Sequence, residues 1–219
     1  MEQIFSQLFY EVEKHRDTVL VTLIADRGSA PRKAGAQMLV GAEGRLVGTI
    51  GGGAVEYRSE QIAKTVLEEK RSGEHDFSLT KNDVQNLGMI CGGTVMVYFR
   101  FFDHCSPQDA ALVRAILELL QSGQDAWLVS RMEQGKITAM GTFDETQGLR
   151  FAQLDEQMLR SWLTSSAVYQ KGEPSYYVEP ISRAGRVYIF GGGHVGRALV
   201  PVLANVGFRV TVFDNREDF

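Results

Sequence analysis

The feature that most restricts the fold is a glycine-spaced turn near the C-terminus. The apolar run RVYIF leads directly into GGGHVG, residues 191–196, which satisfies the spacing G-x-G-x-x-G. A helix is expected over 194–206, followed by a second strand over 209–213 that ends at Asp214. Because strand, turn, helix and acid occur in this order, residues 184–219 are predicted to begin a Rossmann-like unit.

Each position of this turn has a physical role in binding a pyrophosphate group. Gly191 permits the tight turn, Gly193 lets the backbone approach a phosphate, and Gly196 allows close packing of helix on strand. The helix N-terminus offers unpaired N–H groups and the positive end of a dipole. Asp214 can accept hydrogen bonds from ribose hydroxyls, which favours NAD over NADP, although Arg216 weakens that preference. The alternative is a scaffold that binds no nucleotide.

The chain is expected to hold only part of such a domain. It ends at Phe219, shortly after the second strand, whereas a doubly wound sheet has about five or six strands. We therefore expect a truncated product, or a unit that packs on the N-terminal domain or on a partner. Either case lowers the affinity for NAD(P) that the motif implies.

The composition is that of an ordinary globular protein. The 219 residues are 44% hydrophobic and 23% charged, with a formal net charge of −4. No segment forms a basic arm, which argues against nucleic-acid binding through bulk charge. No apolar run approaches the roughly 18 residues of a membrane helix, and the N-terminus lacks the layout of a signal peptide. With only two cysteines and no CxxC pair, a reducing cytoplasm is the expected location.

Residues 1–103 are expected to form a first domain, a mixed sheet with flanking helices. Apolar residues at three- and four-residue steps predict a short amphipathic helix at the start of the chain. The run TVLVTLIA, residues 18–25, predicts a strand buried on both faces. Further strands are expected over 37–40, 46–50, 77–79 and 94–102, with a helix over 54–69.

Residues 104–183 are expected to form an αβ connecting region packed beside the first domain. Ser106 and Pro107 mark the start of a helix, as an N-cap followed by proline at the first helical position. The expected elements are helices over 107–120 and 155–163, a hairpin over 126–132 and 136–143, and a strand over 176–181. The fold class of the whole chain is therefore predicted to be α/β.

The phrase GTIGGGAVE places three glycines between a strand and a helix. Gly51, Gly52 and Gly53 reproduce the geometry of an anion site at a helix N-terminus, but a tight turn without a ligand explains them equally well. Glu56 argues against a pure phosphate site. Its carboxylate can cap the helix or accept hydrogen bonds from a heterocycle.

The phrase GMICGG places a cysteine in a second glycine-rich loop. Gly92 and Gly93 leave the sulfur of Cys91 accessible to a ligand, and thiolates bind soft metals and sulfur. The alternative is a small buried hydrophobic residue. Cys105 receives no role. Neither cysteine has partners at the spacing of a zinc site, and the four histidines suggest no Ser-His-Asp or Cys-His arrangement.

A third loop, GSAPRKAG, carries positive charge. Arg32 and Lys33 could meet an anionic ligand, the arginine as a bidentate fork, or could form a solvated basic turn.

Three phrases in this order are more specific together than any one alone: GSAPRKAGAQMLV, GTIGGGAVE and LGMICGG. They precede FGGGHVGRAL and a segment that ends in VFDNRED. This set resembles the xanthine dehydrogenase accessory factor family, also called XdhC/CoxI. The resemblance is close over residues 18–103, loose in layout over 104–185, and resumes from 186 to the end.

The resemblance implies a role in enzyme maturation. Family members bind and protect molybdenum cofactor, assist its sulfuration by a cysteine desulfurase, and help deliver it to an apo molybdenum hydroxylase. It implies a binding and delivery protein rather than a turnover enzyme. The site residues that the motifs carry over are Gly28, Ser29, Pro31, Arg32, Gly51, Gly52, Gly53, Glu56, Cys91, Gly92, Gly93, Gly191, Gly193, Gly196 and Asp214.

Molybdopterin carries a phosphate, a polar pterin and a dithiolene, and the loops offer one group suited to each. Arg32, Glu56 and Cys91 are these groups, with glycine N–H groups holding the phosphate and Cys91 near the metal or relaying sulfur. Because they come from three separate loops, this expectation requires the loops to converge. A homodimer is expected, since a partial Rossmann unit leaves an apolar face to cover.

Two other function classes stay open. An NAD(P)-dependent oxidoreductase is supported by the glycine turn, but the partial fold and the absence of a credible proton donor argue against it. A non-catalytic nucleotide-sensing module would bind NAD or ADP and regulate a partner without retaining molybdenum cofactor.

Overall fold

The computed structural model describes residues 1–28, 34–78, 93–181, 185–206 and 208–216. The chain divides into two compact units, Met1–Ile181 and Ser182–Phe219, and each is described by itself. The helices are α1 (Glu2–Glu13), α2 (Gly53–Glu69), α4 (Pro107–Ser122), α5 (Glu156–Arg160) and α6 (His194–Asn205). Among the described residues, no helix combines the length and the apolar character needed to span a bilayer.

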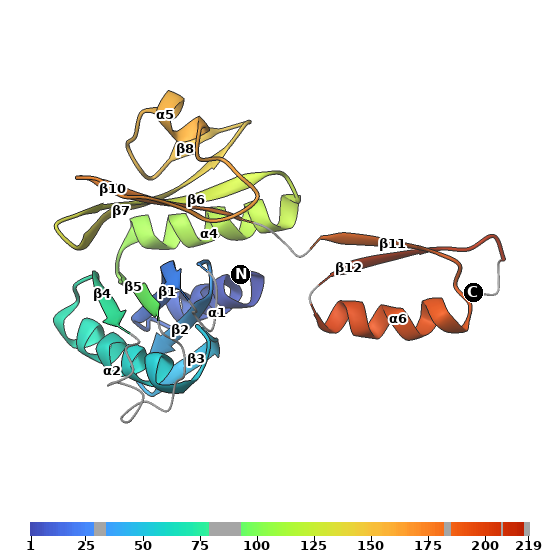
Figure 1. Ribbon diagram of the computed structural model, residues 1–219, viewed down its shortest axis with the longest axis horizontal. Helices are drawn as coiled ribbons and strands as arrows, with labels where there is room; N and C mark the ends of the chain where they lie inside the picture. The colour runs from blue at the N-terminus through green and yellow to red at the C-terminus, as the bar shows by residue number, and fades with distance from the viewer. Residues whose placement is uncertain (29–33, 79–92, 182–184, 207, 217–219) are drawn as a thin grey trace. The chain divides into compact units, whose positions relative to one another are not determined.

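The first sheet lies in the N-terminal half of the larger unit (Figure 1). Its strands follow the order β3-β2-β1-β5-β4, and every pairing is antiparallel. The strands are β1 (Thr18–Gly28), β2 (Gln37–Gly41), β3 (Gly44–Gly48), β4 (Gly73–Ser78) and β5 (Gly93–Phe102). The expected α/β class is confirmed, while the sheet is antiparallel rather than mixed, because each described strand pairs with a neighbour of opposite direction.

The second sheet has the order β8-β7-β6-β10-β9, again with antiparallel pairings. Its strands are β6 (Ala126–Glu133), β7 (Lys136–Asp144), β8 (Gly148–Arg150), β9 (Val168–Gln170) and β10 (Ser175–Pro180). The predicted hairpin is present as β6 and β7. The edge strands β8 and β9 were not expected, because three residues are too few to show a period-two pattern.

The first half of strand β1 is mostly apolar because it packs on both sides of the first sheet. Val19, Val21 and Leu23 belong to one core with helix α2, whereas Leu20 belongs to another core with α1 and α4. This second core continues into the second sheet through residues of β6 and β7 and so joins the two halves. The expected boundary at 103/104 is therefore a change of sheet within one compact unit.

The smaller unit is a β–α–β arrangement. β11 (Arg186–Phe190) and β12 (Arg209–Phe213) pair in parallel, and α6 connects them (Figure 1). The last glycine of the motif is needed for packing, because a Cβ at Gly196 would lie 2.1 Å from the carbonyl oxygen of Gly191. Gly191 itself has φ +116°, a conformation that other residues rarely adopt.

Candidate functional site

The described ends of two motif loops lie side by side at one end of the first sheet. Gly28, the last residue of β1, pairs with Gly93, the first residue of β5. β4 ends on the other side of β5, where Ser78 pairs with Thr94. The segment 29–33 therefore follows β1, and the segment 79–92 connects β4 with β5, the strand next to β1.

The third motif follows β3, which runs in the same direction as β1 but stops well before the end of β1. β3 ends at Gly48, which pairs with Met38 of β2, and the amide of Thr49 donates to the carbonyl of Gln37 at 2.9 Å. Met38 pairs in turn with Val21 of β1, so the GTIGGG turn leaves the sheet beside the first half of β1 and then leads into α2.

Five of the predicted site residues lie outside the part of the chain that the structure describes. These are Ser29, Pro31, Arg32, Cys91 and Gly92. The structure thus brings the ends of two motif loops together, and the convergence of all three loops stays a prediction.

Glu56 in the first turn of α2 holds the glycine turn in place. Its Oε2 atom accepts hydrogen bonds from the amides of Ile50 and Gly52, each at 3.0 Å, and from the Thr49 hydroxyl. Its Oε1 atom lies 2.6 Å from a guanidinium nitrogen of Arg45. Glu56 therefore caps the turn and the helix, which is one of the two roles expected for it.

The environment of Glu56 favours the ionised carboxylate. Partial burial opposes ionisation, but the hydrogen bonds from Thr49, Gly52 and Ile50 and the charge of Arg45 outweigh it, and the pKa is lowered. The three glycines permit this geometry with φ values of +128°, +75° and +63°. Because a carboxylate of the chain already bonds two amides of this turn, those two amides do not serve an external phosphate in this arrangement.

A buried carboxyl group lies beside the first residue of β2. Glu179 of β10 accepts a hydrogen bond of 2.6 Å from the Gln37 side chain and one of 3.2 Å from the Tyr177 hydroxyl. Burial raises its pKa to about 8, against opposing effects of the Tyr177 hydroxyl, the N-terminal ammonium and Gln37. Glu179 therefore carries a proton over much of the neutral range.

Glu179 was not among the functional residues predicted from the sequence. It stands in the run SYYVEP, where an isolated acid is typical of a solvated strand residue. Its burial depends on the first sheet packing against the second, which no local pattern reveals.

In the smaller unit, the predicted acid bonds the glycine turn itself. Asp214 accepts hydrogen bonds from the Gly192 amide at 2.5 Å and from the Arg216 side chain at 2.8 Å. These contacts, first that with Arg216 and then that with Gly192, lower the pKa of Asp214. The carboxylate is therefore already bonded at the position from which it was expected to meet a ribose.

An open depression lies at the carboxyl ends of β11 and β12, where nucleotides bind in open α/β sheets. It has a volume of about 500 Å³. Its lining residues are Phe190, Gly191, Phe213, Asp214 and Asn215. The first glycine of the motif and Asp214 thus lie at one shallow, partly aromatic surface.

Comparison with known proteins connects the larger unit with one family. Residues 12–78 match the model of the XdhC and CoxI family. Over 95 residues the chain is 34% identical to the uncharacterized protein YqeB of Escherichia coli strain K12, covering 43% of this chain and 17% of that protein. The resemblance drawn from the sequence motifs is thereby confirmed.

Two Bacillus proteins match nearly the whole chain. A protein of Bacillus subtilis strain 168, described as a probable subunit of xanthine dehydrogenase, is 24% identical over 216 residues, covering 94% of this chain and 62% of that protein. A crystal structure described as a xanthine dehydrogenase from Bacillus halodurans superposes with a TM-score of 0.76 and 24% identity. It covers 98% of this chain and 63% of that one. The chain therefore spans less than two thirds of the length of each of these relatives, and the structural likeness supports the fold.

Proposed function

The chain is related to the XdhC and CoxI family, and from this premise we propose that it is a maturation factor for a xanthine-dehydrogenase-type molybdenum hydroxylase. In this role it binds molybdenum cofactor, assists its sulfuration and helps insert it into the apo-enzyme. It acts as a binding and delivery protein in the cytoplasm, with a cysteine desulfurase as the sulfur source.

The observation that supports this proposal is that two of the three motif loops start side by side at one end of the first sheet. Gly28 and Gly93 are paired neighbours, and the turn held by Glu56 follows β3, which runs in the same direction as β1. A cofactor with a phosphate, a pterin and a dithiolene needs several kinds of donor close together. Loops that begin at adjacent strands can supply them.

The residue types of the three motif loops suit the cofactor chemically, with one change from the sequence-based expectation. Glu56 bonds the amides of its own turn, so it acts as a positioning residue that fixes the turn beside the other loops. We assign the phosphate to Arg32 and the Gly28–Ser29 backbone, and the soft dithiolene and metal end to Cys91. The cofactor supplies the oxidation–reduction chemistry of the client enzyme, and these residues bind and orient it.

The test is cofactor retention by purified protein. After expression in a molybdenum-replete host, we expect molybdenum and oxidised pterin to copurify with the wild-type chain. Cys91→Ser should lose most of both, because the soft ligand is replaced by a hard hydroxyl. Cys105→Ser is the matched control and should retain both, since Cys105 precedes α4 and is separate in sequence from the motif loops.

Two outcomes would count against the proposal. Wild-type protein free of both molybdenum and pterin would contradict cofactor binding. Equal retention by wild type and Cys91→Ser, together with equal activation of an apo-hydroxylase, would remove Cys91 from the site.

Nucleotide binding by the smaller unit is a second candidate, supported by the β–α–β geometry and the depression at Gly191. A ribose would have to displace the Arg216 side chain from Asp214, so we expect weak binding. Calorimetric titration with NAD and NADP tests this. Hydride transfer from the reduced nucleotide to a small carbonyl compound would favour an oxidoreductase. Tight nucleotide binding by a protein that neither transfers hydride nor retains molybdenum cofactor would favour a sensing module.

A further inference from the structure

A cysteine, a histidine and an aspartate form a hydrogen-bonded chain at the end of the first sheet opposite the motif loops. His104 Nδ1 lies 2.6 Å from Asp17 Oδ1, and His104 Nε2 lies 3.1 Å from Cys105 Sγ. Asp17 precedes β1, and His104 and Cys105 follow the end of β5, where Thr18 pairs with Phe102. No Cys-His arrangement was predicted from the sequence. His104 and Cys105 are adjacent in the sequence, but Asp17 stands 87 residues before His104, and only the fold brings it to them.

The aspartate fixes the histidine in one orientation. Asp17 Oδ1 also accepts a hydrogen bond of 3.1 Å from the His104 amide, and Asp17 Oδ2 lies 3.2 Å from the ammonium of Lys70. Burial opposes ionisation of Asp17, but these contacts outweigh it and lower its pKa. In the tautomer that carries its proton on Nδ1, His104 donates to Asp17, and Nε2 can then accept the proton of the thiol.

The position of Cys105 along the chain leaves its sulfur open to a reactant. It immediately precedes Ser106, the N-cap of the sixteen-residue helix α4, and its side chain is exposed. Helix N-termini and neighbouring imidazoles are the environments that activate cysteines in proteins. The exposure gives a reactant direct access to sulfur.

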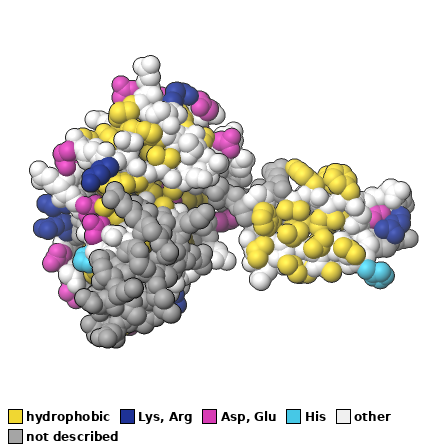
Figure 2. Space-filling model, viewed as in Figure 1, with side chains coloured by type: hydrophobic (Ala, Val, Ile, Leu, Met, Phe, Trp, Pro, Cys, Tyr) yellow, Lys and Arg dark blue, Asp and Glu magenta, His cyan; other side chains and the backbone are white. Residues whose placement is uncertain are grey.

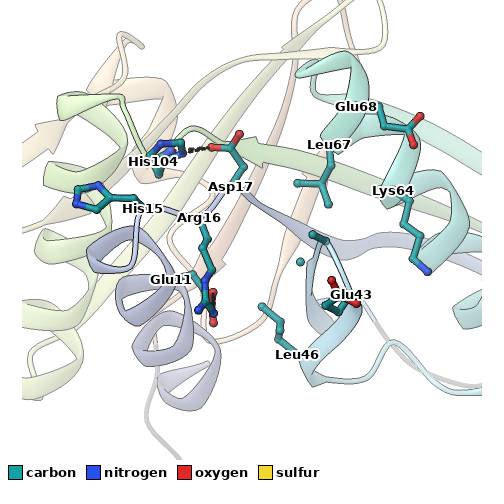
Figure 3. Close-up of a pocket in the computed structure, with 12 residues that line it drawn as sticks. Glu11, His15, Arg16, Asp17, Glu43, Leu46, Lys64, Leu67, Glu68 and His104 are labelled. Atoms are coloured by element: carbon teal, nitrogen blue, oxygen red, sulfur yellow. Dashed lines mark hydrogen bonds and ion pairs between the residues drawn. The ribbon is translucent and has the colours of Figure 1, made fainter.

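His104 and Asp17 also line an open pocket with a volume of about 820 Å³ (Figure 3). Figure 3 shows the two side chains joined by a hydrogen bond on one side of the pocket, with His15 beside them and Lys64 across it. Cys105 is not among the lining residues, and His104 connects its sulfur with the charged groups of the pocket.

We propose that Cys105 is a nucleophilic thiol that reacts with low-molecular-weight disulfides, with His104 as its base and Asp17 as the positioning residue. His104 Nε2 takes the thiol proton, and the sulfur attacks one sulfur atom of the disulfide. The disulfide bond breaks as the mixed disulfide forms. The departing thiolate takes the proton from the imidazolium. Cys105 is oxidised, one half of the small disulfide is reduced, and the step needs no molybdenum cofactor.

The experiment uses Cys91→Ser protein, in which Cys105 is the remaining cysteine of the chain. An aromatic disulfide that releases a coloured thiolate reports the rate near neutral pH, and glutathione is the reference thiol. We expect Cys105 to react on the order of tenfold faster than glutathione, and His104→Gln to abolish that excess. Asp17→Asn should reduce it by a smaller factor and shift the pH profile of the rate.

Unfolding in urea is the control and should remove the excess reactivity, because it separates Asp17 from His104. Tryptophan fluorescence would verify that each variant is folded, since Trp127 and Trp162 both pack in the larger unit. Equal rates for folded and unfolded protein, or no effect of His104→Gln, would overturn the proposal. So would a thiol that reacts only after a chelator is added, which would indicate a metal held by Asp103, His104 and Cys105.

Discussion

At the scale of single residues, two glutamates show how the environment decides what a carboxyl group does. Glu56 is partly buried, accepts hydrogen bonds from two backbone amides and faces Arg45, so its pKa is lowered and it holds a turn as an anion. Glu179 is fully enclosed, and burial raises its pKa to about 8. Glutamate is thus an ionised cap at position 56 and a protonated, neutral carboxyl group at position 179 below about pH 8.

Glu179 predicts a pH dependence of stability. Its folded pKa of about 8 exceeds its unfolded value of 4.5, so the folded state binds the extra proton. The stability from this group is complete below pH 4.5 and is lost as the pH rises toward 8. For Glu179→Gln we expect the free energy of unfolding, relative to wild type, to increase with pH over this range, by at most about 1.4 kcal/mol per pH unit.

Urea unfolding followed by tryptophan fluorescence at several pH values measures this difference. Glu133→Gln, a partly exposed change on β6, is the matched control and should show no such trend. A constant difference between Glu179→Gln and wild type from pH 5 to pH 8 would show that Glu179 is ionised in the folded protein.

At the scale of elements, the β–α–β turn distinguishes a glycine needed for packing from one that is not. A Cβ at Gly196 would collide with the Gly191 carbonyl at 2.1 Å, whereas at Gly193 the nearest atom is the end of the Arg216 side chain at 3.9 Å. We expect Gly196→Ala to destabilise the smaller unit by about 1–3 kcal/mol through overpacking. Gly193→Ala should have little effect.

Hydrogen exchange of α6 and β12 amides measures this prediction, because faster exchange reports local opening of the smaller unit. The fluorescence of the two tryptophans, both in the larger unit, should not change. Equal exchange rates in the two alanine variants would contradict the packing role of Gly196.

At the scale of the whole molecule, the smaller unit taken by itself exposes many apolar side chains, visible over most of its face in Figure 2. Phe190 is 83% exposed, Val195 74% and Val202 61%. Exposed apolar surface of this kind is typical of interaction sites. The homodimer predicted from the sequence would use this surface.

Self-association through this surface can be tested with a double variant. We expect Phe190→Ser with Val202→Ser to shift the protein toward the monomer in light scattering over a concentration series, because two exposed apolar groups are removed. Tyr57→Ser, which removes an exposed aromatic side chain from α2, is the control and should associate as wild type does. A wild-type protein that is monomeric at all concentrations would rule out the homodimer.

Local chemistry along the chain determined much of this protein. The spacing of apolar residues predicted α1, and the continuous apolar run predicted β1. The glycine spacing between two strands predicted the β–α–β unit. Each of these signals lies within one or two neighbouring elements. The motif phrases likewise indicated a resemblance to the XdhC and CoxI family, whose model matches residues 12–78. None of these features depends on which strands pair.

Only the tertiary structure decided which distant residues meet. It paired Gly28 with Gly93, enclosed Glu179 against Gln37 from the other sheet, and placed Asp17 beside His104. It also showed that Glu56 and Asp214 bond their own glycine turns. The physical reason is that strand pairing and sheet packing join segments far apart in sequence, so a side chain's burial and partners depend on contacts that no local pattern encodes.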